Sequence, residues 1–86
     1  MSVTVTLIGK EGCHLCDEAK TVIESVAVDF PDVSVEEVSL TDNPLWDELY
    51  GELIPVVLID GVEHSHWRVD ATAFSEALAE RVTAEV

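Results

Sequence analysis

The stretch Gly12-Cys13-His14-Leu15-Cys16 holds both cysteines of this 86-residue chain, with two residues between them. The preceding residues, 3–8, alternate between apolar and polar side chains and predict a β-strand. The residues that follow carry apolar side chains at helical spacing, which predicts a helix over about 13–28. The two thiols therefore belong at the first turn of a helix. Unpaired backbone N–H groups and the helix dipole favour a thiolate there, and the thiolate is the reactive form of cysteine.

Length and composition predict one globular domain over residues 1–86. Two cysteines are too few for a disulfide framework, and the N-terminus shows no basic region followed by a long apolar run. No apolar run approaches the ~18–20 residues of a membrane span. We therefore expect a cytoplasmic protein without a membrane partner. In that compartment the cysteine pair is kept reduced, and it is catalytic or metal-binding rather than structural.

The charge of the chain is strongly one-sided, with 18 acidic residues against four basic ones and a net charge of −14. Binding to nucleic acid requires lysine and arginine at the phosphates, so the composition excludes nucleic acid as a partner. Two interpretations of the acidic surface remain open. It keeps a small protein soluble and monomeric, or it attracts a partner that has a basic docking face.

The rest of the chain predicts the element order βαβαββα, an α/β fold with a four-stranded mixed sheet and three helices. A second strand over 33–40 follows the first helix, so these two strands should be parallel. Its alternation slips at Glu36-Glu37. The later signals are a helix start at Asn43-Pro44, a helix end at Gly51, a strand over 55–59, a hairpin turn at Asp60-Gly61, a strand over 62–67 and a helix cap at Asp70.

A Cys-x-x-Cys pair at a strand-to-helix turn is typical of redox-active proteins. One alternative is that both cysteines simply face the core. Another is a zinc site made by Cys13, Cys16, His64 and His66, because the two histidines would share one face of the last predicted strand. The spacing of these histidines is narrower than usual in such sites, and the chain has no second Cys-x-x-Cys.

Around these cysteines the chain resembles the glutaredoxin branch of the thioredoxin-like superfamily, and within it the small bacterial proteins with Cys-x-Leu-Cys and a Tyr-Gly pair, here Tyr50-Gly51. The resemblance covers nearly the whole chain and implies a thioredoxin-like fold. It implies that Lys10 corresponds to a family lysine that helps to bind the carboxylate of glutathione. It also implies that the Ile54-Pro55 bond is cis, with Pro55 facing the dithiol and the Ile54 backbone open for pairing with a substrate.

The chain departs from the glutaredoxin pattern at two places. Neither residue between the cysteines is proline, and the family's Gly-Gly-Asp after the last strand is replaced by the bulkier residues 65–70. Without that glycine ledge the backbone approach needed by the glutamyl end of glutathione is blocked. The acidic surface also repels the anionic tripeptide. We therefore expect glutathione to be a poor partner.

The predicted function is thiol–disulfide exchange, with Cys13 attacking a substrate disulfide and Cys16 resolving the mixed disulfide. The Cys13–Cys16 pair is itself the redox group, and no other cofactor is expected. The substrate is a disulfide-bearing protein or a small thiol compound, and an unidentified reductant completes the cycle. Because nearby acids oppose the cations that favour the Cys13 thiolate, we expect a reductant rather than a strong oxidant.

Three further residues are candidates for the site. Lys10 and His14, if charged, favour the neighbouring thiolate, and each could instead be an ordinary solvated side chain. Arg68 either receives a substrate carboxylate or forms a surface ion pair. The competing functional class is a non-catalytic module that keeps the fold and docks a basic partner.

Overall fold

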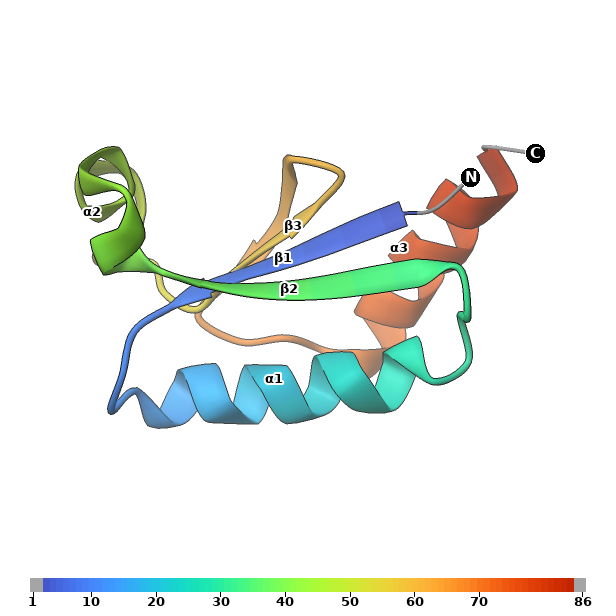
Figure 1. The fold of residues 1–86 in the computed structure, drawn as a ribbon. Coiled ribbons are helices and arrows are strands. Elements are labelled where there is room, and N and C mark those ends of the chain that lie inside the picture. Colours follow the sequence, from blue (N-terminus) through green and yellow to red (C-terminus); the bar gives the residue numbers. More distant parts are fainter. Residues whose placement is uncertain (1–2, 85–86) are drawn as a thin grey trace.

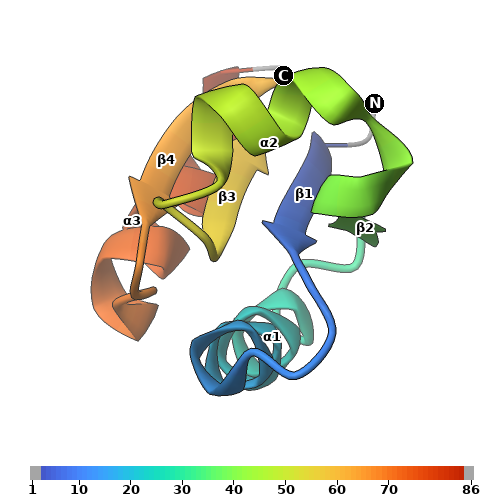
Figure 2. The same cartoon turned by 90° about the vertical axis from the view of Figure 1, so that its left-hand side faces the viewer.

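The structure is a computed structural model and describes residues 3–84. A mixed sheet lies between α2 on one face and α1 and α3 on the other (Figures 1 and 2). In chain order the elements are β1 (Val3–Gly9), α1 (His14–Ala27), β2 (Val33–Ser39), the short 3₁₀ helix η1 (Leu40–Asp42), α2 (Pro44–Tyr50), β3 (Val56–Ile59), β4 (Val62–His66) and α3 (Ala71–Ala84).

The strands lie in the order β2-β1-β3-β4. β1 and β2 are parallel, as the intervening helix requires, whereas β1 pairs with β3 and β3 with β4 in antiparallel fashion. The predicted βαβαββα order, the four-stranded mixed sheet and the three helices are confirmed. The central position of β1 explains why nearly all of its residues are buried.

Side chains of β1 alternate between two apolar layers, one on each face of the sheet. Leu7 lies in the layer beneath α1 and α3, and Ile8 lies in the layer beneath α2. The larger layer contains the most deeply buried helix residues, Ile23, Phe74 and Leu78. The smaller layer is closed by half-buried side chains, because α2 contributes no buried residue. These layers fix the positions of α1 and of the first residues of β3 relative to the rest of the sheet.

The strand β2 continues without interruption through Glu36-Glu37, where the sequence pattern slips. Its register with β1 is regular, with Thr6 opposite Glu36 and Leu7 opposite Glu37. The Thr6 hydroxyl donates a hydrogen bond of 3.0 Å to the Glu36 carboxylate. Because β2 is an edge strand and largely exposed, its side chains need not alternate between apolar and polar types.

Local signals predicted most element boundaries correctly. The Asn43 side chain accepts from the Leu45 N–H at 3.0 Å, and Asp70 accepts from the Ala73 N–H at 2.9 Å. Asp60 and Gly61 both have positive φ, 51° and 83°, as a type I′ hairpin turn requires. Gly51 differs from the prediction. It is the C-cap of α2 with a right-handed φ of −53°, one position earlier than the glycine that usually follows a helix.

Candidate active site

Cys13 is the N-cap residue of α1 and has an extended backbone (φ −91°, ψ 109°). Its half-buried Sγ accepts a hydrogen bond of 3.2 Å from the backbone N–H of Cys16. A serine or aspartate oxygen commonly accepts this bond at a helix start, so the sulfur takes the place of a capping oxygen. The sulfur that lies at the positive end of the helix dipole is therefore that of Cys13.

Cys16 lies inside the first turn of α1, and only 8% of its surface is exposed. Burial raises the pKa of the Cys16 thiol to about 11, and a hydrogen bond with the Cys13 side chain acts in the same direction. A backbone hydrogen bond from Lys10 opposes this rise. The two cysteines therefore differ in kind. Cys16 is a protonated thiol at neutral pH, and it lies behind the more accessible Cys13.

The sulfur of Cys16 packs against the end of β1 at Gly9. A Cβ atom added at Gly9 would lie only 2.7 Å from Cys16 Sγ and 3.1 Å from its Cβ. Any larger residue would displace the Cys16 side chain, because real Cβ atoms do not approach a sulfur so closely. This contact was not predicted from the sequence. No local pattern could have revealed it.

A groove of about 540 Å³ opens beside Cys16, between the β1–α1 loop and the end of β2. Lys10, exposed in that loop, lies along its wall. Acidic side chains outnumber this lysine in the groove. Its complete lining is Leu7, Gly9, Lys10, Glu11, Gly12, Cys16, Asp17, Glu37, Val38, Ser39 and Asp42. The structure thus brings Lys10 together with Cys16. His14, the first residue of α1, is exposed.

The Ile54-Pro55 peptide bond is cis, which confirms the prediction made from the family resemblance. Pro55 is buried and Ile54 is half-buried. The backbone N–H of Trp67 donates to the carbonyl oxygens of Leu53 and Pro55, at 3.1 and 2.9 Å. Within residues 3–84 the N–H and C=O groups of Ile54 make no hydrogen bond. One backbone donor and one backbone acceptor of Ile54 are therefore unpaired within residues 3–84.

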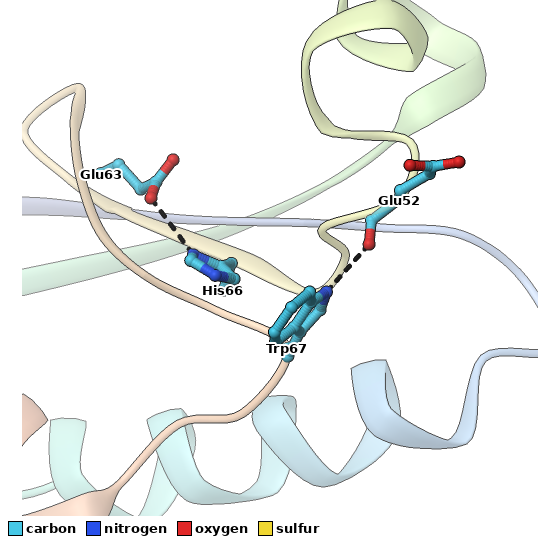
Figure 3. Close-up of polar contacts among 4 residues, drawn as sticks. All are labelled: Glu52, Glu63, His66 and Trp67. Carbon is cyan, nitrogen blue, oxygen red and sulfur yellow. Dashed lines mark hydrogen bonds and ion pairs between the residues drawn. The ribbon is translucent and has the colours of Figure 1, made fainter.

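Trp67 lies across this proline segment, as the hairpin geometry predicts (Figure 3). Its indole Nε1–H donates to the Glu52 carbonyl at 2.8 Å, and its ring meets that of His66 edge-to-face with centroids 4.8 Å apart. The His66 ring in turn lies 3.4 Å from the Glu63 carboxylate. The backbone of Trp67 has a positive φ of 65°. The residue is also 54% exposed. The hydrogen bond of the indole was not predicted from the sequence.

A second groove of about 470 Å³ runs between α1 and the segment that joins β4 to α3. One wall is formed by α1 and the other by residues 67–69. The lining residues are Leu15, Glu18, Ala19, Thr21, Val22, Trp67, Arg68 and Val69. The exposed Arg68 forms no ion pair among residues 3–84. The structure thus brings Arg68 into the same groove as Leu15, which lies between the two cysteines.

The geometric premise of the zinc alternative is wrong. β4 pairs Glu63 with Leu58 and Ser65 with Val57, so His64 is an additional, bulged residue. Its ring lies against Phe74 of α3, with centroids 5.7 Å apart, whereas His66 faces the opposite side of the sheet. The two histidines do not share a face. Among residues 3–84, no group of three or more histidine, cysteine, aspartate or glutamate side chains is arranged to hold a metal ion.

The arrangement of sheet and helices is that of the thioredoxin-like class, as comparison with solved structures shows. A protein of Nitrosomonas europaea, solved in solution, superposes with a TM-score of 0.76 at 22% identity, covering 90% of this chain and 92% of its own. Chloroplastic thioredoxin z gives 0.74 at 18% identity, covering 92% and 77%. A mutant thioredoxin of Halobacterium salinarum gives 0.66 at 19% identity, covering 92% and 74%.

Within that class the chain belongs to the glutaredoxin-like domain family DUF836, which matches residues 4–79. A protein of Mycobacterium tuberculosis and one of Mycobacterium bovis, both described as uncharacterized, are each 33% identical over 70 residues. The match covers 77% of this chain and 72% of theirs. The family and the Cys13–Cys16 pair together indicate a thiol–disulfide redox role.

None of the helices formed by residues 3–84 is long and apolar enough to span a membrane.

Proposed function

We propose that this protein is a thiol–disulfide oxidoreductase that reduces disulfides with its Cys13–Cys16 dithiol. The observation that carries the proposal is the asymmetry of the pair. Cys13 Sγ caps the helix and accepts a hydrogen bond from the Cys16 N–H, whereas Cys16 is buried behind it with a pKa of about 11. A nucleophile that is more accessible than the resolving thiol, and a protected resolving thiol, are what two-step exchange requires.

In the first step the Cys13 thiolate attacks one sulfur of the substrate disulfide. A bond forms between Cys13 and that sulfur while the substrate S–S bond breaks, and the other substrate sulfur leaves as a thiolate that takes a proton from solvent. The hydrogen bond from the Cys16 N–H and the helix N-terminus stabilise the attacking thiolate.

In the second step Cys16 loses its proton and attacks Cys13 Sγ. The Cys13–Cys16 disulfide forms, the mixed disulfide breaks and the second substrate thiol is released, so that two electrons have passed to the substrate. The Cys16 side chain lies against Gly9 and interacts with the Cys13 side chain. A thiol or dithiol reductant then restores the reduced pair.

The substrate is a disulfide-bearing protein or a small disulfide, and the segment around the cis-proline is its proposed docking edge. The free N–H and C=O of Ile54 are suited to pair with an extended substrate backbone beside the dithiol. Lys10 and Arg68 line grooves on either side of the α1 N-terminus and are proposed to receive anionic groups of the substrate. His14 is proposed to favour the Cys13 thiolate when protonated.

Glutathione is proposed to be a poor partner of this site. Trp67 and Arg68 occupy the chain segment where glutaredoxins have two glycines, and the indole is held there by its bond to the Glu52 carbonyl. The chain also carries a net charge of −14. We propose a monomeric reductase that acts in a reducing compartment such as the cytoplasm, because a reductase needs a supply of thiol reductant.

The test is turnover of insulin disulfides with dithiothreitol as the electron source. The wild-type chain should accelerate the reaction, and Cys13→Ser should abolish the acceleration. Arg81→Lys, far from the dithiol in α3, serves as a folded control that retains activity. A correctly folded wild-type protein with no activity above the uncatalysed rate would favour the alternative, a non-catalytic docking module.

A further inference from the structure

We propose that the groove between α1 and residues 67–69 selects the substrate, and that it binds a protein segment with an aromatic or long aliphatic side chain next to its disulfide cysteine and basic side chains on either side. This inference deepens the proposed function and rests on it. The specificity-determining residue is Trp67, supported across the groove by Leu15.

The place of the groove connects it to the reactive sulfur. Leu15 lies between Cys13 and Cys16 in the chain, so the groove begins at the dithiol and continues along α1 to Val22. Its volume of about 470 Å³ lies within the range of clefts that bind small molecules, so it can accept a side chain. A segment whose cysteine reaches Cys13 therefore has its neighbouring residue at the groove.

The walls of the groove include apolar side chains that remain partly exposed in the folded protein. Leu15 is 38% exposed and Trp67 is 54% exposed, although both are large apolar residues. Val22 and Val69 extend the same surface on opposite walls. Large apolar side chains grouped beside a reactive residue gain free energy when a partner covers them, which suits an apolar side chain of a substrate.

Trp67 is already fixed in the position that such a contact needs. Its indole donates to the Glu52 carbonyl (Figure 3). Its backbone N–H donates to the carbonyls of Leu53 and Pro55. A side chain held in this way loses little conformational entropy when a ligand covers it. Tryptophan is also among the residues that most often dominate binding energy at interfaces.

Charge decides the character of the flanking residues. Glu18 and Arg68 are the charged residues among those that line the groove, and their charges are opposite. Over the whole chain, 18 residues are acidic and four are basic. A segment with basic flanks is therefore attracted, and one with acidic flanks is repelled. The exposed face of Trp67 can also stack on a lysine or arginine.

The experiment measures binding without chemistry, in the full chain carrying Cys13→Ser and Cys16→Ser. Calorimetry gives the Kd of ten-residue peptides with the centre Lys-Phe-Ser-Lys, in which serine replaces the substrate cysteine. The matched peptides are Lys-Gly-Ser-Lys, without the apolar side chain, and Glu-Phe-Ser-Glu, with acidic flanks. We expect the first peptide to bind about tenfold more tightly than either of the others.

Two variants locate the binding site. Trp67→Ala and Leu15→Ser should each raise the Kd of the Lys-Phe-Ser-Lys peptide about fivefold to tenfold, whereas Trp46→Phe should leave it unchanged. Leu15 is partly exposed, so its variant keeps the test valid if Trp67→Ala fails to fold. In the Trp46→Phe background, the fluorescence of Trp67 should change as this peptide binds.

Equal affinities for the phenylalanine and glycine peptides would overturn the inference, as would an unchanged Kd in both groove variants. The proposed function fails by a different result, the lack of insulin reduction by the wild-type protein. A protein that reduces insulin but does not discriminate among the peptides would retain the function and lose the groove as its specificity site.

Discussion

At the residue scale, the chemistry of the pair depends on the different environments of the two cysteine side chains within one helical turn. Cys13 caps the turn and accepts a hydrogen bond from the Cys16 N–H, whereas Cys16 is 8% exposed and faces Gly9. The Cys-x-x-Cys spacing at a strand-to-helix turn was enough to predict which sulfur lies at the helix end. The contact between Cys16 and Gly9 joins a helix to a strand end, and only the packed structure reveals it.

The two cysteines should differ strongly in their rate of alkylation. With a pKa of about 11, the Cys16 thiol is ionised to only about 0.1% near pH 8. Iodoacetamide should therefore label Cys13 of the reduced protein first, and the rate at Cys16 should rise about tenfold for each pH unit up to its pKa. Peptide mapping by mass spectrometry gives both rates. Faster labelling of Cys16 at neutral pH would reverse the assigned roles.

Gly9→Ala should disturb the resolving cysteine specifically. The added Cβ collides with Cys16 Sγ, so we expect a loss of about 1–3 kcal/mol in the free energy of unfolding and a change in the ionisation of Cys16. Denaturant unfolding and thiolate absorbance against pH measure the two effects. Gly12→Ala is the matched control. Its φ of 79° makes the substitution strained, but no atom lies within 4 Å of the added Cβ, so Cys16 should titrate as in wild type.

A Gly9→Ala protein in which Cys16 ionises as in wild type would show that Gly9 does not position the sulfur.

At the element scale, the hairpin turn between β3 and β4 ties three elements together through one carboxylate. Asp60 accepts from the Thr4 N–H of β1 at 2.9 Å and from the Arg81 side chain of α3 at 2.7 Å. These two contacts lower the pKa of Asp60 below its ordinary value of 3.8. The stabilisation is therefore complete above that ordinary value, and it is lost as the pH falls through the lowered pKa.

Asp60→Asn should be less stable than wild type at neutral pH, and the difference should vanish in strong acid, where the wild-type carboxyl is also uncharged. Asparagine tolerates the positive φ of 51° and can still accept from Thr4, so the change isolates the charge. Thermal unfolding across the acid range measures the difference. A difference in Tm that stays constant down to strong acid would exclude the carboxylate as its source.

The elements also show which structural signals are local and which are not. Asn43 and Asp70 accept hydrogen bonds from residues a few positions further along the chain, and the turn at Asp60-Gly61 is set by the φ angles of these two residues. The local sequence therefore predicted the two caps and the turn correctly. The bulge at His64 arises from the pairing of β4 with β3 and from the contact with Phe74. Regular alternation therefore placed His64 and His66 on one face, which was wrong.

At the scale of the whole molecule, the net charge of −14 should make the rate of reaction with a small disulfide depend on the charge of that disulfide. Cystamine is cationic and oxidised glutathione is anionic, so the reduced protein should react at least about tenfold faster with cystamine at low salt. Added salt should shrink this ratio, because exposed charges are screened beyond about 10 Å at 0.1 M. Stopped-flow measurements at increasing salt test both statements. A rate with oxidised glutathione that equals or exceeds the rate with cystamine would contradict the expected preference.

The central claim is that Cys13 attacks and Cys16 resolves, and the most direct measurement is capture of the intermediate. In Cys16→Ser the second step is blocked, so mass spectrometry after reaction with a peptide disulfide should find one peptide attached to Cys13. In Cys13→Ser the buried Cys16 should capture far less peptide over the same time. Equal capture by Cys16, or no capture by Cys13 in a folded protein, would contradict the account.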